Sequence, residues 1–467
     1  MAKRLKLCSN WPSGFLVRQM TAPSSLPLIC VAEGDELPET LGELPLRWAA
    51  ANGFAGQRGR LLAVPDDAGA VAGYLFGMGV ADDRPVLLTG VAGATLDPGD
   101  YRLEGAFGDP TLAALGFRLG AYRFDRYRKG RTAPTLTLPT DADHGEVERL
   151  TEAAFLARNL INTPSNDLGP DAFEREIQAF ANRHGMAVQA IVGDELLVRN
   201  FPMIHAVGRA GPEAPRLLDL RWGREDAPKI TLVGKGVTFD TGGLDIKPPA
   251  SMLLMKKDMG GAANVLGLAH AIIDAGLKVR LRVLIPIVEN SISASAFRPG
   301  DVLPSRSGQT VEIGNTDAEG RLILGDALTL ADEEQPELIL DMATLTGAAR
   351  TALGPDLPAL YSTDDALAQA LMQAGLKLGD PLWQMPLWTP YEAMLNSRLA
   401  DVNHVSSGAF AGSITAALFL KRFVKQARAW VHLDIFAWAP EARPGRPFGG
   451  TDQGIRAVYS VLKQRYS

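Results

Sequence analysis

The chain has 467 residues, of which 46% are hydrophobic and 21% charged, and its formal net charge is -6. This composition is typical of a globular protein with room for two or three domains. The acidic balance gives no indication of nucleic acid or an anionic membrane as the main partner. No stretch approaches the roughly 18 consecutive apolar residues of a membrane span.

The two cysteines, Cys8 and Cys30, have no paired spacing. The sequence therefore predicts neither a disulfide framework nor a zinc ribbon. The N-terminal stretch 1–15 is basic, but polar and turn-forming residues interrupt it, so it does not resemble a signal peptide. We expect a cytoplasmic protein.

The first part of the chain mixes short apolar runs with glycine and proline. Segment 84–93 predicts a buried strand and segment 109–127 a helix, whereas 128–145 has the Pro, Thr and Asp content of a linker. An amphipathic helix is predicted over 146–163, where Val147, Leu150, Ala154, Phe155 and Ile161 recur near a 3.6-residue period.

These features divide the chain into two predicted domains. Residues 1–140 form an N-terminal α/β domain without a cluster of reactive side chains, which we expect to be non-catalytic and a candidate for a role in assembly. Residues 141–467 contain the linker helix and the larger domain.

Strand-like and helix-like segments alternate in the larger domain. The predicted strands are 229–234, 279–288, 337–343 and 430–437, and the predicted helices are 260–276, 321–334 and 412–427. Apolar, β-branched strands separated by helices indicate an α/β fold with a mostly parallel sheet flanked by helices. Ligands of such sheets bind beyond the carboxyl ends of the strands.

Several catalytic motifs are absent from the sequence. It has no P-loop, no GxSxG elbow and no HExxH, and "GKGVTF" keeps only the first glycines of a dinucleotide fingerprint. Its six histidines are scattered, and His205, His270, His404 and His432 lie in or beside apolar segments. Structural roles for these side chains are favoured over a histidine-rich zinc site.

The remaining reactive side chains are mostly acidic and lie in two segments. A glycine-rich region after the first strand contains Lys235, Asp240, Lys247 and Asp258, and "NTDAEGR" adds Asp317, Glu319 and Arg321 just before a helix. Alternation at 317, 319 and 321 would direct these three side chains to one face of an extended segment.

Each acidic motif has a simple structural explanation when taken alone. "NTDAEG" suits a helix N-terminus, and "DTGG" and "DMGG" suit turns in which glycine supplies a positive φ. Together, however, four carboxylates brought to one edge of a sheet need a cation. A two-metal site would supply it, with Mg or Mn suited to oxygen ligands and Zn also accepting Asp and Glu.

Four motifs in this order resemble one family. "VGKGVTFDTGG", "DMGGAA", "NTDAEGRL" and "ATLTGA" are similar to the blocks of the leucyl aminopeptidases, the cytosolic dinuclear metallo-aminopeptidases. The resemblance covers about 155–460 and is most specific over 230–350. It implies that the larger domain is a catalytic metallopeptidase domain.

The resemblance also implies residue roles. The implied metal ligands are Lys235, Asp240, Asp258, Asp317 and Glu319, the implied catalytic residues are Lys247 and Arg321, and the implied substrate pocket contains Met255, Asn315, Thr344, Leu345 and Gly347. Lys247 would stabilise the oxyanion, and Arg321 would hold a bicarbonate that acts as general base. A water activated by the two metals would attack the peptide bond.

As a whole, the resemblance implies a broad-specificity leucyl-type aminopeptidase that acts on peptides with a free N-terminus. It further implies two divalent ions per chain, Mn or Zn, and a homohexamer. Two features depart from the family pattern: Asp245 stands two residues before Lys247, where a small residue is expected and where it could pair with that lysine, and 432–450 differs from the usual ending.

Two other classes of function remain open from the sequence. Carboxylate-rich metal pairs also serve phosphoesterases, which would hydrolyse nitrophenyl phosphate, although the lack of histidine ligands counts against this class. A binding protein that retains an inactive site is the second alternative. Hydrolysis of leucine p-nitroanilide, with and without Mn or Zn, discriminates between these functions.

Overall fold

A computed structural model describes residues 25–467. Cys8 and the N-terminal stretch that we compared with a signal peptide lie outside the described residues, while Cys30 is buried and carries a free thiol. Among the helices of the described chain, none has the length and apolar character needed to cross a membrane.

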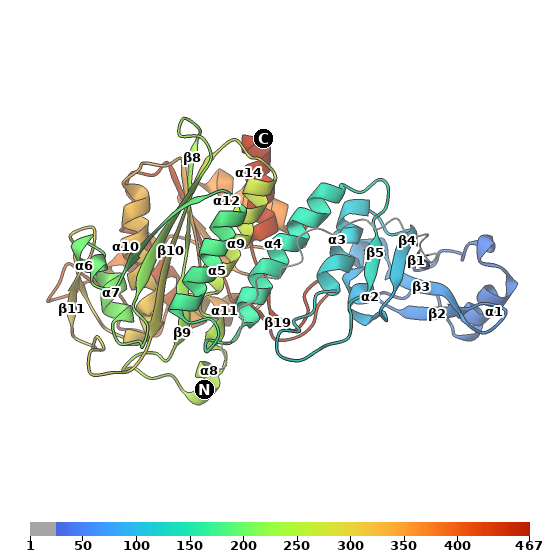
Figure 1. Ribbon diagram of the computed structural model, residues 1–467, viewed down its shortest axis with the longest axis horizontal. Coiled ribbons are helices and arrows are strands. Elements are labelled where there is room, and N and C mark those ends of the chain that lie inside the picture. The colour runs from blue at the N-terminus through green and yellow to red at the C-terminus, as the bar shows by residue number, and fades with distance from the viewer. Residues whose placement is uncertain (1–24) are drawn as a thin grey trace, which may run out of the picture.

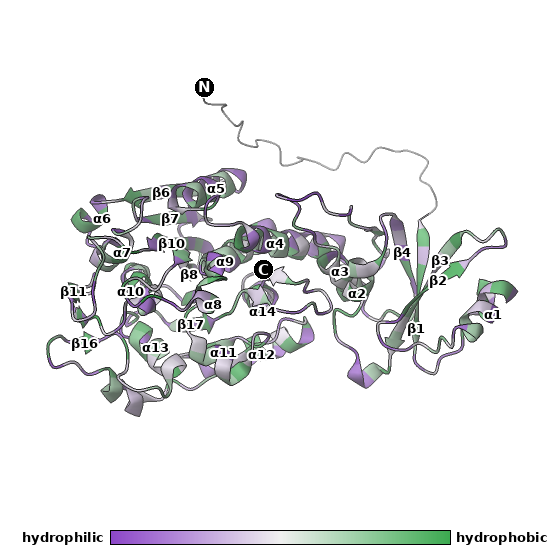
Figure 2. Ribbon diagram, turned by 90° about the horizontal axis from the view of Figure 1, so that it is seen from below, coloured by the Kyte–Doolittle hydropathy of each residue, from purple (hydrophilic) through white to green (hydrophobic). Residues whose placement is uncertain are grey.

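The N-terminal part is built on a five-stranded sheet in the order β2-β3-β1-β4-β5, in which only the β2–β3 pair is antiparallel. Helix α1 packs on one face, and α2 and α3 pack on the other (Figure 2). The bounds are β1 Leu26–Ala32, α1 Glu43–Ala51, β2 Leu61–Pro65, β3 Val71–Gly79, α2 Gly90–Thr95, β4 Asp100–Gly105, α3 Pro110–Gly120 and β5 Thr135–Thr137.

The strand predicted over 84–93 is wrong. This segment forms turns that lead into α2, and its leucines are buried against α3 rather than within a sheet. Glycine allows the two helices to approach closely, because a Cβ at Gly93 would lie 2.1 Å from the carbonyl oxygen of Phe117. An apolar run alone does not distinguish a buried strand from a short buried helix.

Helix α4 (His144–Asn162) connects the two parts of the molecule (Figure 1) and confirms the predicted amphipathic helix. The predicted linker before it contains β5, which pairs with β4 and so belongs to the first sheet. On α4, the fully buried Arg158 donates to the carbonyl oxygen of Leu119 in α3 at 2.8 Å. The same side chain forms an ion pair with Asp452 at 2.7 Å, so one arginine ties both parts together.

A nine-stranded sheet forms the centre of the larger part, in the order β15-β14-β17-β13-β8-β10-β7-β6, with β9 also paired to β10. The four central strands β17, β13, β8 and β10 are mutually parallel. The bounds are β6 Ala187–Val192, β7 Arg216–Trp222, β8 Lys229–Gly234, β9 Gly236–Asp240, β10 Arg280–Asn290, β13 Leu338–Ala343, β14 Ala359–Ser362, β15 Trp383–Gln384 and β17 Ala429–Asp434.

Helices cover both faces of this sheet and bury two separate apolar cores. Helices α4, α5, α9, α12 and α14 contribute to one core, and α7, α10 and α13 contribute to the other. The bounds are α5 Pro170–Arg183, α6 Glu195–Val198, α7 Pro202–Gly208, α8 Pro249–Met252, α9 Gly260–Asp274, α10 Glu319–Asp332, α11 Gly347–Leu353, α12 Asp365–Lys377, α13 Gly412–Lys421 and α14 Ile455–Tyr466. Short strands β11 Val302–Pro304, β12 Thr310–Glu312 and β16 Val402–Asn403 form a third sheet, and β18 Trp438–Ala439 pairs with β19 Gly449–Gly450.

The α/β fold with a smaller N-terminal part and a parallel-rich sheet is confirmed. The predicted strands correspond to β8, β10, β13 and β17, although β17 ends at Asp434 rather than at 437. The predicted helices correspond to α9, α10 and α13, and α13 ends six residues before the predicted end at 427. Because the central strands are parallel, the loops that follow β8, β13 and β17 meet at one edge of the sheet.

Candidate metal centre

The acidic residues converge at this carboxyl edge. Lys235 directly follows β8, and Asp240 ends the short strand β9. Asp258 follows the 3₁₀ helix η3 (Met255–Lys257) and precedes α9. A Cβ at Gly261 would lie 2.0 Å from the carbonyl oxygen of Met342, so glycine is needed where α9 meets the end of β13. Glycine in "DMGG" thus serves close packing, whereas Gly242 and Gly243 in "DTGG" have positive φ as predicted.

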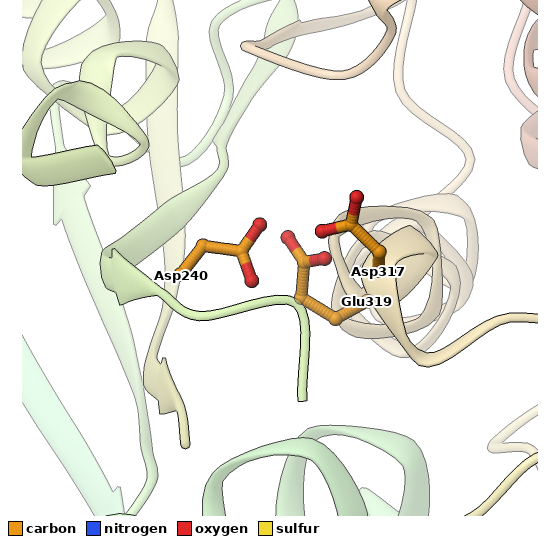
Figure 3. A group of neighbouring side chains, drawn as sticks. All are labelled: Asp240, Asp317 and Glu319. Carbon is orange, nitrogen blue, oxygen red and sulfur yellow. The ribbon is translucent and has the colours of Figure 1, made fainter. Parts of the chain in front are cut away.

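Asp317 and Glu319 do not lie on an extended segment, and that prediction is wrong. Asp317 lies in the 3₁₀ helix η4 (Thr316–Ala318), and Glu319 begins α10. The predicted helix N-terminus is confirmed, because the Asn315 side chain caps η4 by accepting a hydrogen bond from the Asp317 N–H at 2.8 Å. The helical turn still directs both carboxylates toward Asp240 (Figure 3), and oxygens of the three lie within 4.8 Å of one another.

Lys235 forms ion pairs with Asp258 and Glu319 on one side of the cluster. Its Nζ lies 2.8 Å from Asp258 Oδ2 and 2.9 Å from Glu319 Oε1, and it donates to the carbonyl oxygen of Thr344 at 2.9 Å. The lysine is only 3% exposed, so its contacts are shielded from water. A Cβ at residue 320 would lie 2.6 Å from Lys235 Cε, which explains the glycine of "EGR" at this position.

Lys247 binds the other side, with its Nζ 2.9 Å from Asp240 Oδ2 and in contact with Asp317. The expected pairing of Asp245 with Lys247 is not formed between these two described residues. Asp245 instead accepts from the Thr316 N–H at 2.7 Å, and its own N–H donates to Thr316 Oγ1 at 2.8 Å. The aspartate therefore joins the loop before Lys247 to the turn that carries Asp317.

The carboxylates have unused capacity as ligands. Asp258 Oδ2, Asp317 Oδ1 and Glu319 Oε1 are buried near a lysine ammonium, yet none accepts a hydrogen bond of good geometry from a described residue. Buried carboxylate oxygens normally have such partners. Oxygen ligands held this close suit a divalent cation, and the residues present therefore fit the metal that the sequence predicts.

Burial and mutual repulsion shift the pKa values of this cluster. Burial, followed by the charge of Asp240, raises the pKa of Glu319 to about 8 and that of Asp317 to about 6. Burial alone would also raise the pKa of Asp258, but Lys235 lies so close that it holds this pKa below its usual value. Four carboxylates cannot all keep their charge here without more positive charge than two lysines provide.

Arg321 lies in the first turn of α10 and is 8% exposed. Its Nη1 donates to the carbonyl oxygen of His404 at 2.6 Å, while its buried Nε has no hydrogen-bond partner among the described residues. Burial lowers the pKa of Arg321 to about 10, and Glu319 and Asp434 oppose this shift. A guanidinium with an unused N–H group beside the cluster is suited to hold a small anion.

The predicted pocket residues lie around the same edge. Met255 is buried at the start of η3, and the segment Thr344–Gly347 follows β13. Thr344 Oγ1 donates to Asp258 Oδ1 at 2.8 Å. Asn315 caps η4 with its side chain, as the helix start predicted for "NTDAEG" requires.

Two further residues hold the site and were missed. Asn290 Nδ2 donates to Asp240 Oδ1 at 2.8 Å and to the carbonyl oxygen of Thr316 at 3.1 Å. Asp434, at the end of β17, accepts from the N–H groups of Leu345 and Thr346, both at 3.1 Å. Asn290 lies two residues after the predicted strand 279–288, and Asp434 lies inside the predicted strand 430–437, so the sequence contained no signal for either. The histidines predicted to be structural include His432, which is buried 2.5 Å from Asp341 Oδ1.

Comparison with known proteins agrees with this geometry. Residues 155–459 match the model of the cytosol aminopeptidase family, catalytic domain, and residues 26–139 match that of the M17 aminopeptidase, N-terminal domain. The chain belongs to the cytosol aminopeptidase family. Similar proteins include a probable cytosol aminopeptidase of Syntrophotalea carbinolica, 41% identical over 368 residues that cover 75% of this chain and 74% of the relative.

Solved structures of this family are similar over nearly the whole chain. The crystal structure of a cytosol aminopeptidase from Coxiella burnetii has 46% identity and a TM-score of 0.90, with 96% of this chain and 99% of that chain covered. The bottromycin maturation enzyme BotP in complex with Mn has 32% identity and a TM-score of 0.86, with 95% and 100% covered. Membership in the family makes this chain a metal-dependent aminopeptidase that hydrolyses peptides at the N-terminus.

The raised pKa of Glu319 predicts how the metal-free protein responds to pH. The native state holds this proton up to about pH 8, whereas the unfolded chain releases it near the usual glutamate pKa of 4.5. The unfolded state therefore binds fewer protons between these values, and the free energy of unfolding should fall as pH rises through this window. In Glu319→Gln the side chain stays neutral, so this fall should be smaller. Urea unfolding of the chelator-treated wild type and of Glu319→Gln, at several pH values between these two pKa values, measures the free energy of unfolding of each protein. An equal dependence on pH in the two proteins would show that Glu319 does not carry this proton.

Proposed function

We propose that the enzyme is a broad-specificity leucyl-type aminopeptidase that uses two divalent ions, Mn or Zn, held by Lys235, Asp240, Asp258, Asp317 and Glu319. The observation that carries this proposal is the convergence of Asp240, Asp317 and Glu319, whose carboxylate oxygens lie within 4.8 Å of one another. Bound divalent ions would lower the pKa of a coordinated water and polarise the peptide carbonyl group. For Lys235 to be a ligand it must be neutral, and the charge of the ions would favour that form.

Lys247 is the residue that we assign to the oxyanion. The charges of Asp240 and its neighbours raise the pKa of Lys247 despite partial burial, so the side chain stays an ammonium group in the neutral pH range. A fixed positive charge beside the reacting carbonyl stabilises the negative charge that develops on its oxygen. Its contacts with Asp240 and Asp317 would hold it in place without solvent reorganisation.

We assign Arg321 to the binding of a bicarbonate that serves as general base. The four carboxylates of the cluster are all assigned as ligands, so a separate base is required for transfer of the proton to the leaving amine. The unpartnered Nε of Arg321 supports this assignment, since it leaves an N–H donor for an anion. The main-chain contact with His404 fixes the orientation of the guanidinium.

Several broader features remain proposals. We propose a substrate pocket that includes Met255, Asn315, Thr344, Leu345 and Gly347, a domain boundary between residues 140 and 141, and a cytoplasmic homohexamer. The matches of separate N-terminal and catalytic family models on either side of 140–154 support the boundary.

Selectivity for a free amino terminus tests the proposed function directly. The neutral α-amine can bind a divalent ion, and acetylation removes this lone pair and adds bulk near the reacting bond. Leucine p-nitroanilide should therefore release nitroaniline rapidly, whereas acetyl-leucine p-nitroanilide should be a very poor substrate. Similar values of kcat/KM for the two compounds would refute the requirement for a free amine.

Replacement of Lys247 tests its catalytic role separately from metal retention. Lys247→Met should lower kcat by about 100-fold or more, the typical effect of losing an oxyanion-stabilising group. Its metal content should stay at the wild-type value. Lys256→Met is a matched control, since Lys256 lies nearby but donates only to the carbonyl oxygen of Asn162 at 2.7 Å and lies over Trp438. Loss of metal from Lys247→Met would show that the lysine has a ligand-holding role instead.

A further inference from the structure

Two cationic side chains lie beside one aromatic ring close to the metal centre. The guanidinium carbon of Arg350 is 4.6 Å from the centroid of the Phe436 ring, and Lys257 Nζ is 4.9 Å from the same centroid. Within residues 25–467, neither side chain forms a hydrogen bond or an ion pair. Asp258 follows Lys257 directly and its negative charge acts on that side chain, whereas Arg350 has the aromatic ring as its close partner.

Among the described residues, Arg350 is left without a matching anion. It is half-buried, and removal of a cation from water costs free energy unless an anion or hydrogen-bond acceptors replace the water. Contact with an aromatic face compensates only in part. Arg350 also presents a planar set of N–H donors, which matches the two oxygens of a carboxylate.

The position of Arg350 relates it to the substrate pocket. It lies on α11, one turn after Gly347, and a Cβ at Gly347 would be 3.6 Å from Arg350 Nη2. The guanidinium thus lies against the segment 344–347, whose first residue, Thr344, contacts the metal ligand candidates Lys235 and Asp258. Arg350 therefore lies at the far end of a short segment that begins at Thr344, beside the carboxylate cluster.

Phe436 is the aromatic residue against which Arg350 lies. It follows β17 by two residues, and its N–H donates to Gln453 Oε1 at 3.0 Å. Ala437 beside it has a φ of +57°, and its Cβ would lie 2.4 Å from a Cβ at Gly260, so the loop packs directly on the start of α9. The loop that carries Phe436 is therefore packed in a fixed position, and its ring lies against the Arg350 guanidinium.

We propose that Arg350, held against Phe436, selects substrates with a carboxylate in this position, namely an N-terminal glutamate or aspartate side chain. This inference rests on the proposed aminopeptidase function and adds a preference within it. The C-terminal carboxylate of a dipeptide has the same chemistry and is the second source that the experiment must distinguish.

The test compares neutral and charged substrates of equal size. The wild-type enzyme should have a kcat/KM for glutamyl p-nitroanilide about tenfold or more above that for glutaminyl p-nitroanilide, the effect of one charge-assisted contact. In Arg350→Met this ratio should fall to about one, and Arg350→Glu should reverse it. Arg60→Met, which removes an arginine that lies over Phe54 in the N-terminal part, should keep the wild-type ratio.

A second pair of substrates identifies the source of the carboxylate. Leucyl-glycine and leucyl-glycine amide differ only in the C-terminal carboxylate. If Arg350→Met changes the preference within this pair and not the glutamyl preference, the assignment to the N-terminal side chain is wrong. A wild-type glutamyl-to-glutaminyl ratio near or below one would likewise overturn it. Failure to hydrolyse any of these compounds in the presence of Mn or Zn would instead count against the proposed function.

Discussion

The repulsion among Asp240, Asp258, Asp317 and Glu319 is the constraint on which the rest of the site depends. Three of these carboxylates are at most 3% exposed, and oxygens of Asp240, Asp317 and Glu319 lie within 4.8 Å of one another. Like charges at this separation strongly oppose joint ionisation in a site of low water content. Lys235 and Lys247 offset part of this cost, and divalent cations would offset the remainder.

The fold enforces this unfavourable proximity. Parallel pairing of β8, β13 and β17 brings three loops to one edge, and Gly261 and Gly320 allow the ligand-bearing segments to approach closely. Asn290 and Asp434, at the ends of β10 and β17, hold the loops through backbone and side-chain contacts. Free energy from the two large apolar cores therefore keeps the charged residues together. A site arranged in this way is formed before a substrate binds.

The sequence contained enough information to predict the fold class and the convergence of Asp240, Asp317 and Glu319. Strand and helix periodicity in the larger part located the four central strands, and the spacing of "NTDAEGR" indicated that its acidic residues act together. The local conformation of this motif was mispredicted. Acidic residues at alternate positions suit a strand, but η4 and α10 bring Asp317 and Glu319 together through a helical turn. The segment 84–93 was mispredicted because its apolar run is too short to distinguish a strand from a helix.

Contacts between distant segments could not be predicted from local patterns. Asp245 bonds with Thr316, 71 residues away, and not with its neighbour Lys247. The pairing of Arg350 with Phe436 joins a helix after β13 to a loop after β17, so neither residue stands out in its own segment. The departure of 432–450 from the family pattern was visible in the sequence, but the contact of Phe436 with Arg350 was not.

We propose that the carboxylate cluster holds two metal ions, with Asp240 and Glu319 shared between them. The decisive measurement is elemental analysis of protein that has been saturated with Mn or Zn and freed of excess metal. About two equivalents per chain are expected. A firm value of one equivalent would contradict it, because a single ion needs no bridging carboxylates.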